Sequence, residues 1–157
     1  MTPAIEVAKR ANIAFKVYEY DHDPSTKSYG DEAAEVLGLN HDQVFKTLVA
    51  AADSQPVRMV IAVIPVAKRL DLKALSSAVG VKRMTMANET DAERATGYVV
   101  GGISPLGQRK RLPLLLDQSA RDHSTIYVSA GKRGLEIELA PDDLLRLSGG
   151  KCAPICR

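Results

Sequence analysis

The most informative part of the sequence is TGYVVGGISPLGQ, which spans residues 96–108. Its aromatic and β-branched run, YVV at 98–100, predicts a strand that leads directly into the paired glycines Gly101 and Gly102. Paired glycines let a backbone approach a ligand closely and leave N–H groups free to donate to an oxyanion or a phosphate. A tight structural turn is the competing interpretation of the same residues.

Two common glycine-loop motifs are excluded by the residues that follow. A phosphate-binding P-loop requires Lys-Ser or Lys-Thr after its last glycine, and Gln108-Arg109 stands there instead. A nucleophile elbow around Ser104 requires a glycine two residues later, where the sequence has Leu106. The stretch therefore matches neither motif.

Outside this stretch, helix start and stop signals alternate with runs of β-branched and apolar residues. The expected helices begin at Pro3, near Ser28, at Asp71, near Asn88 and at Pro141. The expected strands are 15–20, 44–51, 59–66, 82–86, 112–117, 125–129 and 134–139. Residues 44–66 and 125–139 are each typical of a hairpin, and the order is not a regular βαβ series. We expect an α/β (α+β) fold in one domain, residues 1–157, with a curled mixed β-sheet or barrel-like sheet surrounded by helices.

Composition narrows the possible functions. The 157 residues include 21 Lys and Arg against 19 Asp and Glu, a net charge of +2. This balance excludes a protein that coats nucleic acid non-specifically, so contact with RNA needs a local basic patch. Aromatic residues make up only 4% of the chain, which argues against single-strand binding by aromatic stacking. The sequence shows no secretory signal, and its longest apolar run, residues 59–67, is too short to span a membrane, so we expect a cytoplasmic protein.

Lys46 is the second candidate functional residue. It stands inside the apolar run VFKTLV, residues 44–49, where strand alternation places its side chain with those of Val44 and Leu48. A lysine in such a position can bind a phosphate or stabilise developing negative charge. Alternatively, its aliphatic stem covers apolar surface while its ammonium meets water.

Other candidate side chains are less distinctive. Ser129 precedes a glycine-containing turn, and it either lines a pocket or satisfies the backbone of that turn. The sequence DHD at 21–23 has no second ligand at metal spacing, so we expect solvated turn residues and no metal site. Cys152 and Cys156 lack the second ligand pair of a structural zinc site, and residues 151–157 are expected to fray.

Taken together, these segments resemble the YbaK/EbsC family. The resemblance rests on residues 96–108, on KRLP at 110–113, on VFKTL at 44–48, on IYVS at 126–129 and on GKRGL at 131–135. It extends from residue 1 to about residue 147, and the glycine stretch is its most specific part. The sequence is most similar to the free-standing Cys-tRNA(Pro) deacylases of this family, which resemble the editing domain inserted in some prolyl-tRNA synthetases.

The resemblance implies a curled mixed sheet with outer helices, and hydrolysis of a wrongly attached amino acid from tRNA. It places the essential lysine at Lys46. It also implies a substrate pocket around Tyr20, Tyr29, Thr47, Gly101, Ser129 and Glu136, and we expect Ile103 and Ser104 to line the same pocket. Many relatives have Phe where Tyr29 stands, and some have Asp in place of Glu136. Alternatively, Glu136 is solvated and not part of the pocket, since it shares a strand face with Glu138.

We expect the aminoacyl ester to be cleaved without an activated protein nucleophile. The backbone N–H groups of Gly101 and Gly102 would polarise the ester carbonyl. Lys46 would hold the phosphate or ribose of the terminal adenosine and offset negative charge. The resemblance implies attack by the thiol of the cysteine substrate itself, so that the enzyme mainly supplies orientation. No cofactor and no metal are expected.

Two alternatives stay open at this point. The enzyme could remove another small amino acid, such as alanine, with water as the nucleophile. The chain could also be a non-catalytic module that binds tRNA or a synthetase. The expected partners are aminoacyl-tRNA(Pro) and prolyl-tRNA synthetase, with no DNA and no membrane.

Overall fold

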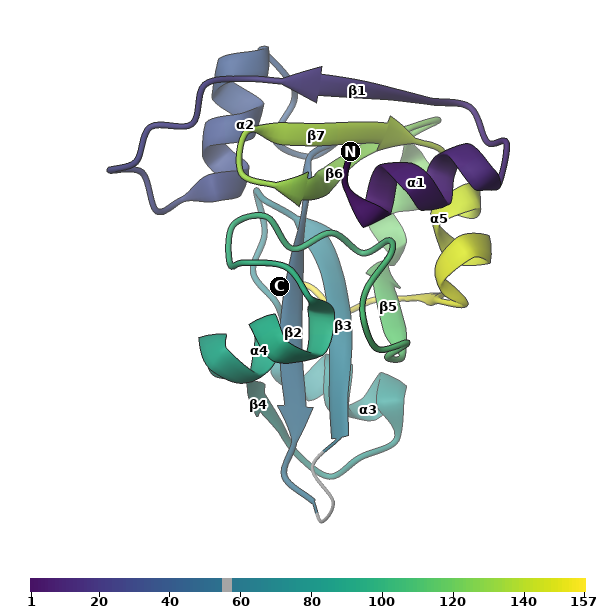
Figure 1. Cartoon of the computed structure of the whole chain (residues 1–157). Helices are drawn as coiled ribbons and strands as arrows, with labels where there is room; N and C mark the ends of the chain where they lie inside the picture. The colour runs from purple at the N-terminus through teal and green to yellow at the C-terminus, as the bar shows by residue number, and fades with distance from the viewer. Residues whose placement is uncertain (55–57) are drawn as a thin grey trace.

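The computed structural model describes residues 1–54 and 58–157 and consists of two β-sheets with helices packed around them (Figure 1). Its helices are α1 (Pro3–Arg10), α2 (Tyr29–Leu37), α3 (Leu72–Val79), α4 (Glu89–Thr96) and α5 (Pro141–Ser148), with a 3₁₀ helix at Gln118–Asp122. Its strands are β1 (Phe15–Glu19), β2 (Phe45–Ala52), β3 (Arg58–Pro65), β4 (Met84–Met86), β5 (Leu114–Asp117), β6 (Ile126–Lys132), β7 (Leu135–Leu139) and β8 (Lys151–Ala153).

The strands form two sheets that meet at one place rather than a single curled sheet. The smaller sheet has the order β1-β7-β6, and the larger one has the order β4-β2-β3-β5-β8. The pairs β2–β3 and β6–β7 are antiparallel, which confirms the two expected hairpins, and β3–β5 is parallel, so the larger sheet is mixed. Residues 55–57 of the first hairpin lie outside the described residues. A parallel bridge from Val44 to Tyr127 joins the two sheets where β2 begins.

Helix boundaries follow the local signals in the sequence. Thr2 caps α1 with its side chain, and a proline occupies the first helical turn. Gly38, Gly80 and Gly97 end α2, α3 and α4 in the left-handed conformation that glycine favours. Ser28 precedes α2 as expected, but its side chain makes no capping hydrogen bond. None of the helices described here has the length and apolar character needed to cross a bilayer.

β2 contributes to two separate hydrophobic cores. Val49 packs in the main core, which lies between the sheets and includes Ile137 of β7. Ala50 packs in the second core, on the opposite face of the larger sheet, together with Leu75 of α3 and Ile155. Because side chains alternate along a strand, the two faces of β2 lead to different surroundings.

The C-terminal residues 151–157 do not fray, contrary to expectation. β8 pairs parallel with β5, and the side chain of Ile155 is fully buried. The Ile155 C=O accepts a hydrogen bond from Asp71 N–H at 2.7 Å, and its own N–H donates to Asp117 Oδ1 at 3.1 Å. This segment therefore completes the larger sheet and closes the second core.

Residues 98–100 do not form the expected strand. They follow α4 after one residue and enter a turn in which Gly102 N–H donates to Val99 C=O at 2.8 Å. Gly101, the third residue of this Val99–Gly102 turn, has a φ of +90°. A type II turn requires positive φ at its third residue, so Gly101 is needed for the turn itself.

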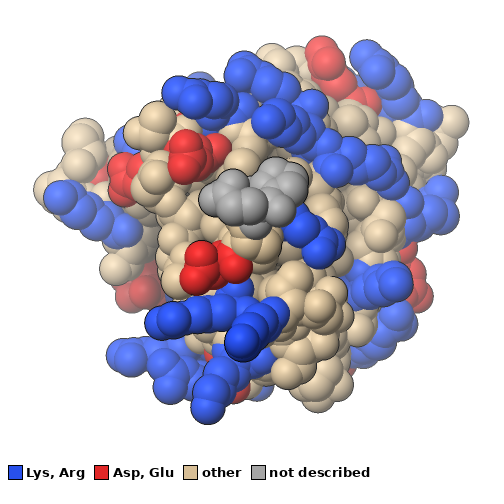
Figure 2. All heavy atoms as spheres, turned by 90° about the horizontal axis from the view of Figure 1, so that it is seen from below, with Lys and Arg blue, Asp and Glu red and all other residues tan. Residues whose placement is uncertain are grey.

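Positive charge is unevenly distributed over the surface. Figure 2 shows the end of the molecule at which β2 ends and β3 begins, and Lys and Arg side chains predominate over acidic ones around it. Arg83 lies at this end, because its C=O accepts a hydrogen bond from Asp53 N–H at 3.1 Å. A chain with a small net charge thus presents a basic face, which is a candidate for the local patch that contact with RNA requires.

Candidate active site

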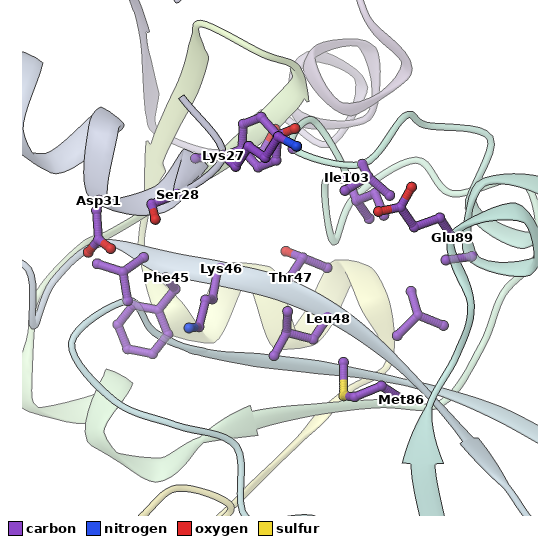
Figure 3. A pocket seen from close by; sticks show the side chains of 18 of the residues that line it. Lys27, Ser28, Asp31, Phe45, Lys46, Thr47, Leu48, Met86, Glu89 and Ile103 are labelled. Atoms are coloured by element: carbon purple, nitrogen blue, oxygen red, sulfur yellow. The ribbon is translucent and has the colours of Figure 1, made fainter. Parts of the chain in front are cut away.

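A cavity of about 530 Å³ lies where α2, β2, the smaller sheet and the loop after α4 meet (Figure 3). This volume is in the range of about 300–1,000 Å³ typical of small-molecule sites. The cavity is lined by most of the expected site residues: Tyr20, Tyr29, Lys46, Thr47, Gly101, Ile103, Ser129 and Glu136. Gly102 and Ser104 do not line it.

One wall of the cavity is an unpaired stretch of β2. β4 pairs with β2 only at Ala50–Ala52, and Ala87 N–H then donates to Val49 C=O at 3.0 Å. Within the described chain, residues 45–48 have no strand on that side. Because backbone groups alternate in direction along a strand, the N–H and C=O of Thr47 point out of this free edge, as the Val49 C=O does.

Lys46 and Thr47 extend from opposite faces of β2 (Figure 3). Lys46 shares its face with Leu48, as expected, and its ammonium has no hydrogen bond or ion pair to any residue that the structure describes. The hydroxyl of Thr47 is buried without a partner among the described residues. Leaving a buried hydroxyl unpaired costs about 1–3 kcal/mol, which a ligand that bonds to it would remove.

The two paired glycines have different roles. Gly101 lines the cavity, and its N–H makes no hydrogen bond to the residues that the structure describes. Gly102 is buried, its N–H is occupied by Val99, and a Cβ at this position would lie 2.9 Å from Lys132 Cα. Gly102 therefore serves packing and the turn, and its N–H, which was expected at the ester carbonyl, is bonded to Val99 in this structure.

Ser104 is also a structural residue rather than part of the cavity. It is fully buried, and its Oγ accepts a hydrogen bond from Leu106 N–H at 3.2 Å. Its C=O accepts a hydrogen bond from Gln108 Nε2 at 2.9 Å. These bonds hold the loop that follows the Val99–Gly102 turn.

The ring of Tyr29 connects α2 to this turn. A Cβ at Gly101 would lie 2.7 Å from the ring, so the two residues are in close contact. The guanidinium of Arg133 lies 4.8 Å from the ring centroid, within cation–π range. Arg133 Nε also donates to Val100 C=O at 2.8 Å. Arg133 thus holds the turn and the tyrosine in one arrangement.

Ser129 and Glu136 lie directly opposite each other on β6 and β7. Ser129 Oγ accepts a hydrogen bond from Gly131 N–H at 3.2 Å and also lines the cavity, so both interpretations of this residue are correct. Glu136 is only 6% exposed, and its carboxyl has no hydrogen-bond partner in the described part of the chain. Burial raises the pKa of Glu136 to about 8. The alternative interpretation, in which the Glu136 carboxylate is solvated, is therefore wrong.

The protein as a whole matches a known group of proteins. Residues 23–147 match the model of the aminoacyl-tRNA editing domain family. The chain belongs to this family. Two arrangements described above, the Val99–Gly102 turn and the free edge of β2, lie inside the matched residues of the editing domain.

Individual relatives support the same assignment. EbsC of Enterococcus faecalis, a proposed Cys-tRNA(Pro)/Cys-tRNA(Cys) deacylase, is 40% identical over 154 residues, covering 98% of this chain and 92% of EbsC. Proline–tRNA ligase of Limosilactobacillus fermentum is 25% identical over 135 residues, covering 85% of this chain but 22% of the ligase. The crystal structure of a proposed trans-editing enzyme for prolyl-tRNA synthetase has a TM-score of 0.79, with 23% identity and coverage of 100% of this chain and 99% of that one. This structural likeness confirms the expected fold class.

The structure also contains a polar pair that the sequence did not indicate. His22 Nδ1 lies 2.7 Å from Glu32 Oε1, and Asp23 N–H donates to Glu32 Oε2 at 2.8 Å. His22 is therefore bonded to α2 rather than solvated in a turn. Burial, with the nearby Glu136 and Glu32 carboxyls, raises the pKa of Tyr20 to about 12. In the described part of the chain, no group of three or more His, Cys, Asp and Glu could hold a metal ion.

Proposed function

We propose that this editing domain is a deacylase that cleaves the aminoacyl ester of Cys-tRNA(Pro). The observation that carries the proposal is the cavity, in which the Thr47 hydroxyl, the Glu136 carboxyl and the Gly101 N–H lack partners within the described chain. A synthetase pocket built for proline rejects a residue of cysteine's size by only roughly 10–200-fold. A second site that removes cysteine after the error supplies the missing discrimination.

Glu136 binds the α-ammonium group of the substrate. The carboxyl is buried and unpartnered, so its ionised form is unfavourable in the empty cavity. A cation placed beside it favours ionisation, and the resulting ion pair is strong where water is excluded. Ser129, directly across the strand pair, bonds to the same end of the substrate.

The ester carbonyl is polarised by the N–H groups of Gly101 and Thr47. Both groups are held by the fold, one by the Val99–Gly102 turn and the other by the free edge of β2. Preorganised donors of this kind each contribute about 10²–10³ to kcat. Thr47 replaces Gly102 as the second donor, because the Gly102 N–H is bonded to Val99.

The nucleophile is the thiol of the substrate. The sulfur attacks the carbonyl carbon of its own cysteine, so a C–S bond forms and the bond from this carbon to the ribose oxygen breaks. The thiol proton is transferred to that leaving oxygen, and the resulting thiolactone is hydrolysed by water to cysteine. No histidine is present among the described residues that line the cavity, so Ser129 has no such base beside it.

Lys46 binds a phosphate of the tRNA terminus and offsets the charge that develops on the leaving ribose oxygen. It does so from the face of β2 opposite to Thr47, so the terminal nucleotide crosses the free edge of the strand. Prolyl-tRNA synthetase is the proposed source of the mischarged tRNA and the proposed partner.

A deacylation panel tests this function. Cysteinyl-, seryl- and alanyl-tRNA(Pro) are compared, with and without prolyl-tRNA synthetase, for the unmodified protein and for Lys46→Ala. We expect fast cleavage of the cysteinyl ester only, and a loss of at least tenfold in Lys46→Ala. A Lys46→Ala rate within a few-fold of the unmodified protein would remove the lysine from the mechanism. Faster cleavage of the alanyl ester would favour water as nucleophile, and tRNA binding without any turnover would favour a non-catalytic module.

A further inference from the structure

The cavity continues around the free edge of β2 onto the opposite face of the strand. Lys46, Leu48 and Met86 line this part of it (Figure 3). Met86 of β4 lies opposite Ala50 of β2, so its side chain is on the same face as that of Leu48. The contacts proposed for the amino acid lie on the Thr47 face, and this second part of the cavity has no role in them.

The second part of the cavity presents an apolar surface to solvent. Met86 is 47% exposed, although Met84 of the same strand is 4% exposed in the second core. Leu48 beside it is half-buried. Because both side chains line the cavity, they offer apolar contact area to a ligand bound there. A thioether next to a leucine is a surface on which a flat nucleobase can stack.

Two lysines adjoin this apolar surface. Burial, followed by the neighbouring Asp117, raises the pKa of the Cys156 thiol to about 12, and the ammonium groups of Lys46 and Lys68 oppose this rise. The position of Lys68 also follows from the fold, because Leu70, two residues later, bridges to Cys156, and Cys156 packs with Leu48 against the second core. Lys68 is exposed, just beyond β3, where its N–H donates to Pro65 C=O at 3.1 Å. Neither lysine forms an ion pair with a residue that the structure describes.

We propose that Lys46, Leu48, Lys68 and Met86 form a nucleotide strip that binds the 3′-terminal adenosine of the aminoacyl-tRNA. The base stacks on Leu48 and Met86, and the terminal phosphate lies between the two lysines. This inference rests on the proposed function, because an aminoacyl ester joins the amino acid to the ribose of that nucleotide. From the strip, the ester reaches across the free edge of β2 to Thr47.

The volume of the cavity agrees with separate parts for the amino acid and for the nucleotide. A volume of about 530 Å³ is typical of sites for drug-sized molecules, and a cysteinyl group fills only part of it. An amino acid joined to an adenosine is a ligand of the appropriate class. Lys46, Leu48 and Met86 line the part of the cavity that is available to the nucleotide.

The test compares a substrate that has a nucleotide with one that lacks it. Lys68→Ala and Met86→Ser are assayed on cysteinyl-tRNA(Pro) and on cysteine ethyl ester, after urea unfolding has shown that each variant folds. The controls are Lys9→Ala, an exposed lysine on α1, and Val36→Ser, an exposed apolar residue on α2. We expect KM for the tRNA to rise about 5- to 100-fold in the strip variants, as for the loss of one stacked base or one phosphate contact. The ethyl ester rate and both controls stay within twofold.

The dependence on salt gives a second readout. Lys68→Ala should reduce the slope of log affinity against log salt concentration by about 0.7–1, the value of one phosphate contact, whereas Met86→Ser should leave the slope unchanged. An unchanged KM for the tRNA, or an equal loss on both substrates, would overturn the nucleotide strip.

A binding measurement distinguishes failure of the nucleotide strip from failure of the proposed function. If the unmodified protein cleaves neither substrate, the proposed function has failed, and the strip is tested by fluorescence polarisation with a labelled ACCA tetranucleotide. Weaker binding by both strip variants than by both controls supports the strip in that case. Equal binding by all four variants overturns it.

Discussion

Tyr29 and Gly101 lie so close together that position 101 has no room for a side chain. A Cβ there would come within 2.7 Å of the tyrosine ring, and the φ of +90° is itself a conformation that L side chains rarely adopt. The ring is also held by Arg133, whose guanidinium lies 4.8 Å from its centroid. The wall of the cavity between α2 and the Val99–Gly102 turn therefore depends on the absence of one methyl group.

Gly101→Ala should lower kcat/KM for cysteinyl-tRNA(Pro) at least tenfold, because the new methyl group displaces the Tyr29 ring. Gly38→Ala is the matched control, since Gly38 has a φ of +68° but no atom within 4 Å of a built Cβ. Backbone strain of about 1 kcal/mol is common to both variants, and the clash belongs to only one of them. Urea unfolding and deacylation rates measure the two effects, and an equal loss of activity in both variants would contradict the role of the contact.

Arg133→Lys should lower kcat/KM for cysteinyl-tRNA(Pro) about 3- to 10-fold and should resemble Arg133→Ala. Lysine keeps the charge, but it cannot reproduce the planar group that covers Tyr29 while its Nε donates to Val100 C=O. The neighbouring Lys132, exposed at the end of β6, supplies the control Lys132→Ala, which should have no effect. If Arg133→Lys retained full activity, the positive charge alone would account for the contribution of Arg133 to activity.

Thr47→Val should stabilise the protein by about 1 kcal/mol while lowering deacylation about 3- to 10-fold, because it removes a hydroxyl available to the substrate but keeps the Thr47 N–H. The substitution removes a buried hydroxyl that has no partner among the described residues, and it keeps the shape of the side chain. Thr96→Val is the opposite case, because Thr96 Oγ1 donates to Ala92 C=O at 2.8 Å and accepts from Tyr98 N–H at 3.2 Å. That control should be destabilised by about 1–2 kcal/mol. Destabilisation of Thr47→Val, measured by urea unfolding, would show that the hydroxyl is paired in solution.

Glu136→Gln should remove a dependence of stability on pH. The pKa of Glu136 is raised from 4.5 to about 8 in the folded protein, so between these values the folded state holds a proton that the unfolded state has released. The free energy of unfolding therefore falls as pH rises through this window, and stays lower above it. Glu136→Gln lacks this pH-dependent loss. From pH 4 to pH 9, the difference in free energy of unfolding between the two proteins should shift in favour of the variant by on the order of a few kcal/mol. Parallel unfolding profiles across pH 4–9 would contradict this.

The ends of the helices could be predicted because their causes are local. A proline after Thr2, and a glycine directly after the last helical residue at Gly38 and Gly97, act within a few residues of themselves. The opposite orientation of Lys46 and Thr47 also follows from strand alternation alone. These features require no knowledge of what packs against them.

Features that depend on distant partners could not be predicted. Glu136 is buried on β7 opposite Tyr18 of β1, more than a hundred positions away, and Ile155 is buried in the second core with Leu75 of α3. The YVV run at 98–100 suits a strand, but it pairs with no strand among residues 1–54 and 58–157, and Gly101 allows a turn instead. The loss of the Gly102 N–H to this turn is equally invisible in the sequence.

The placement of adjacent residues on opposite faces of β2 limits how this strand can change. Substitutions at position 47 alter one side of the cavity, and those at positions 46 and 48 alter the other, so each side can drift while the other is conserved. A single inserted or deleted residue has a different result, because a shift by one position exchanges the two faces along the whole strand. β2 should therefore tolerate changes of residue type far better than changes of length.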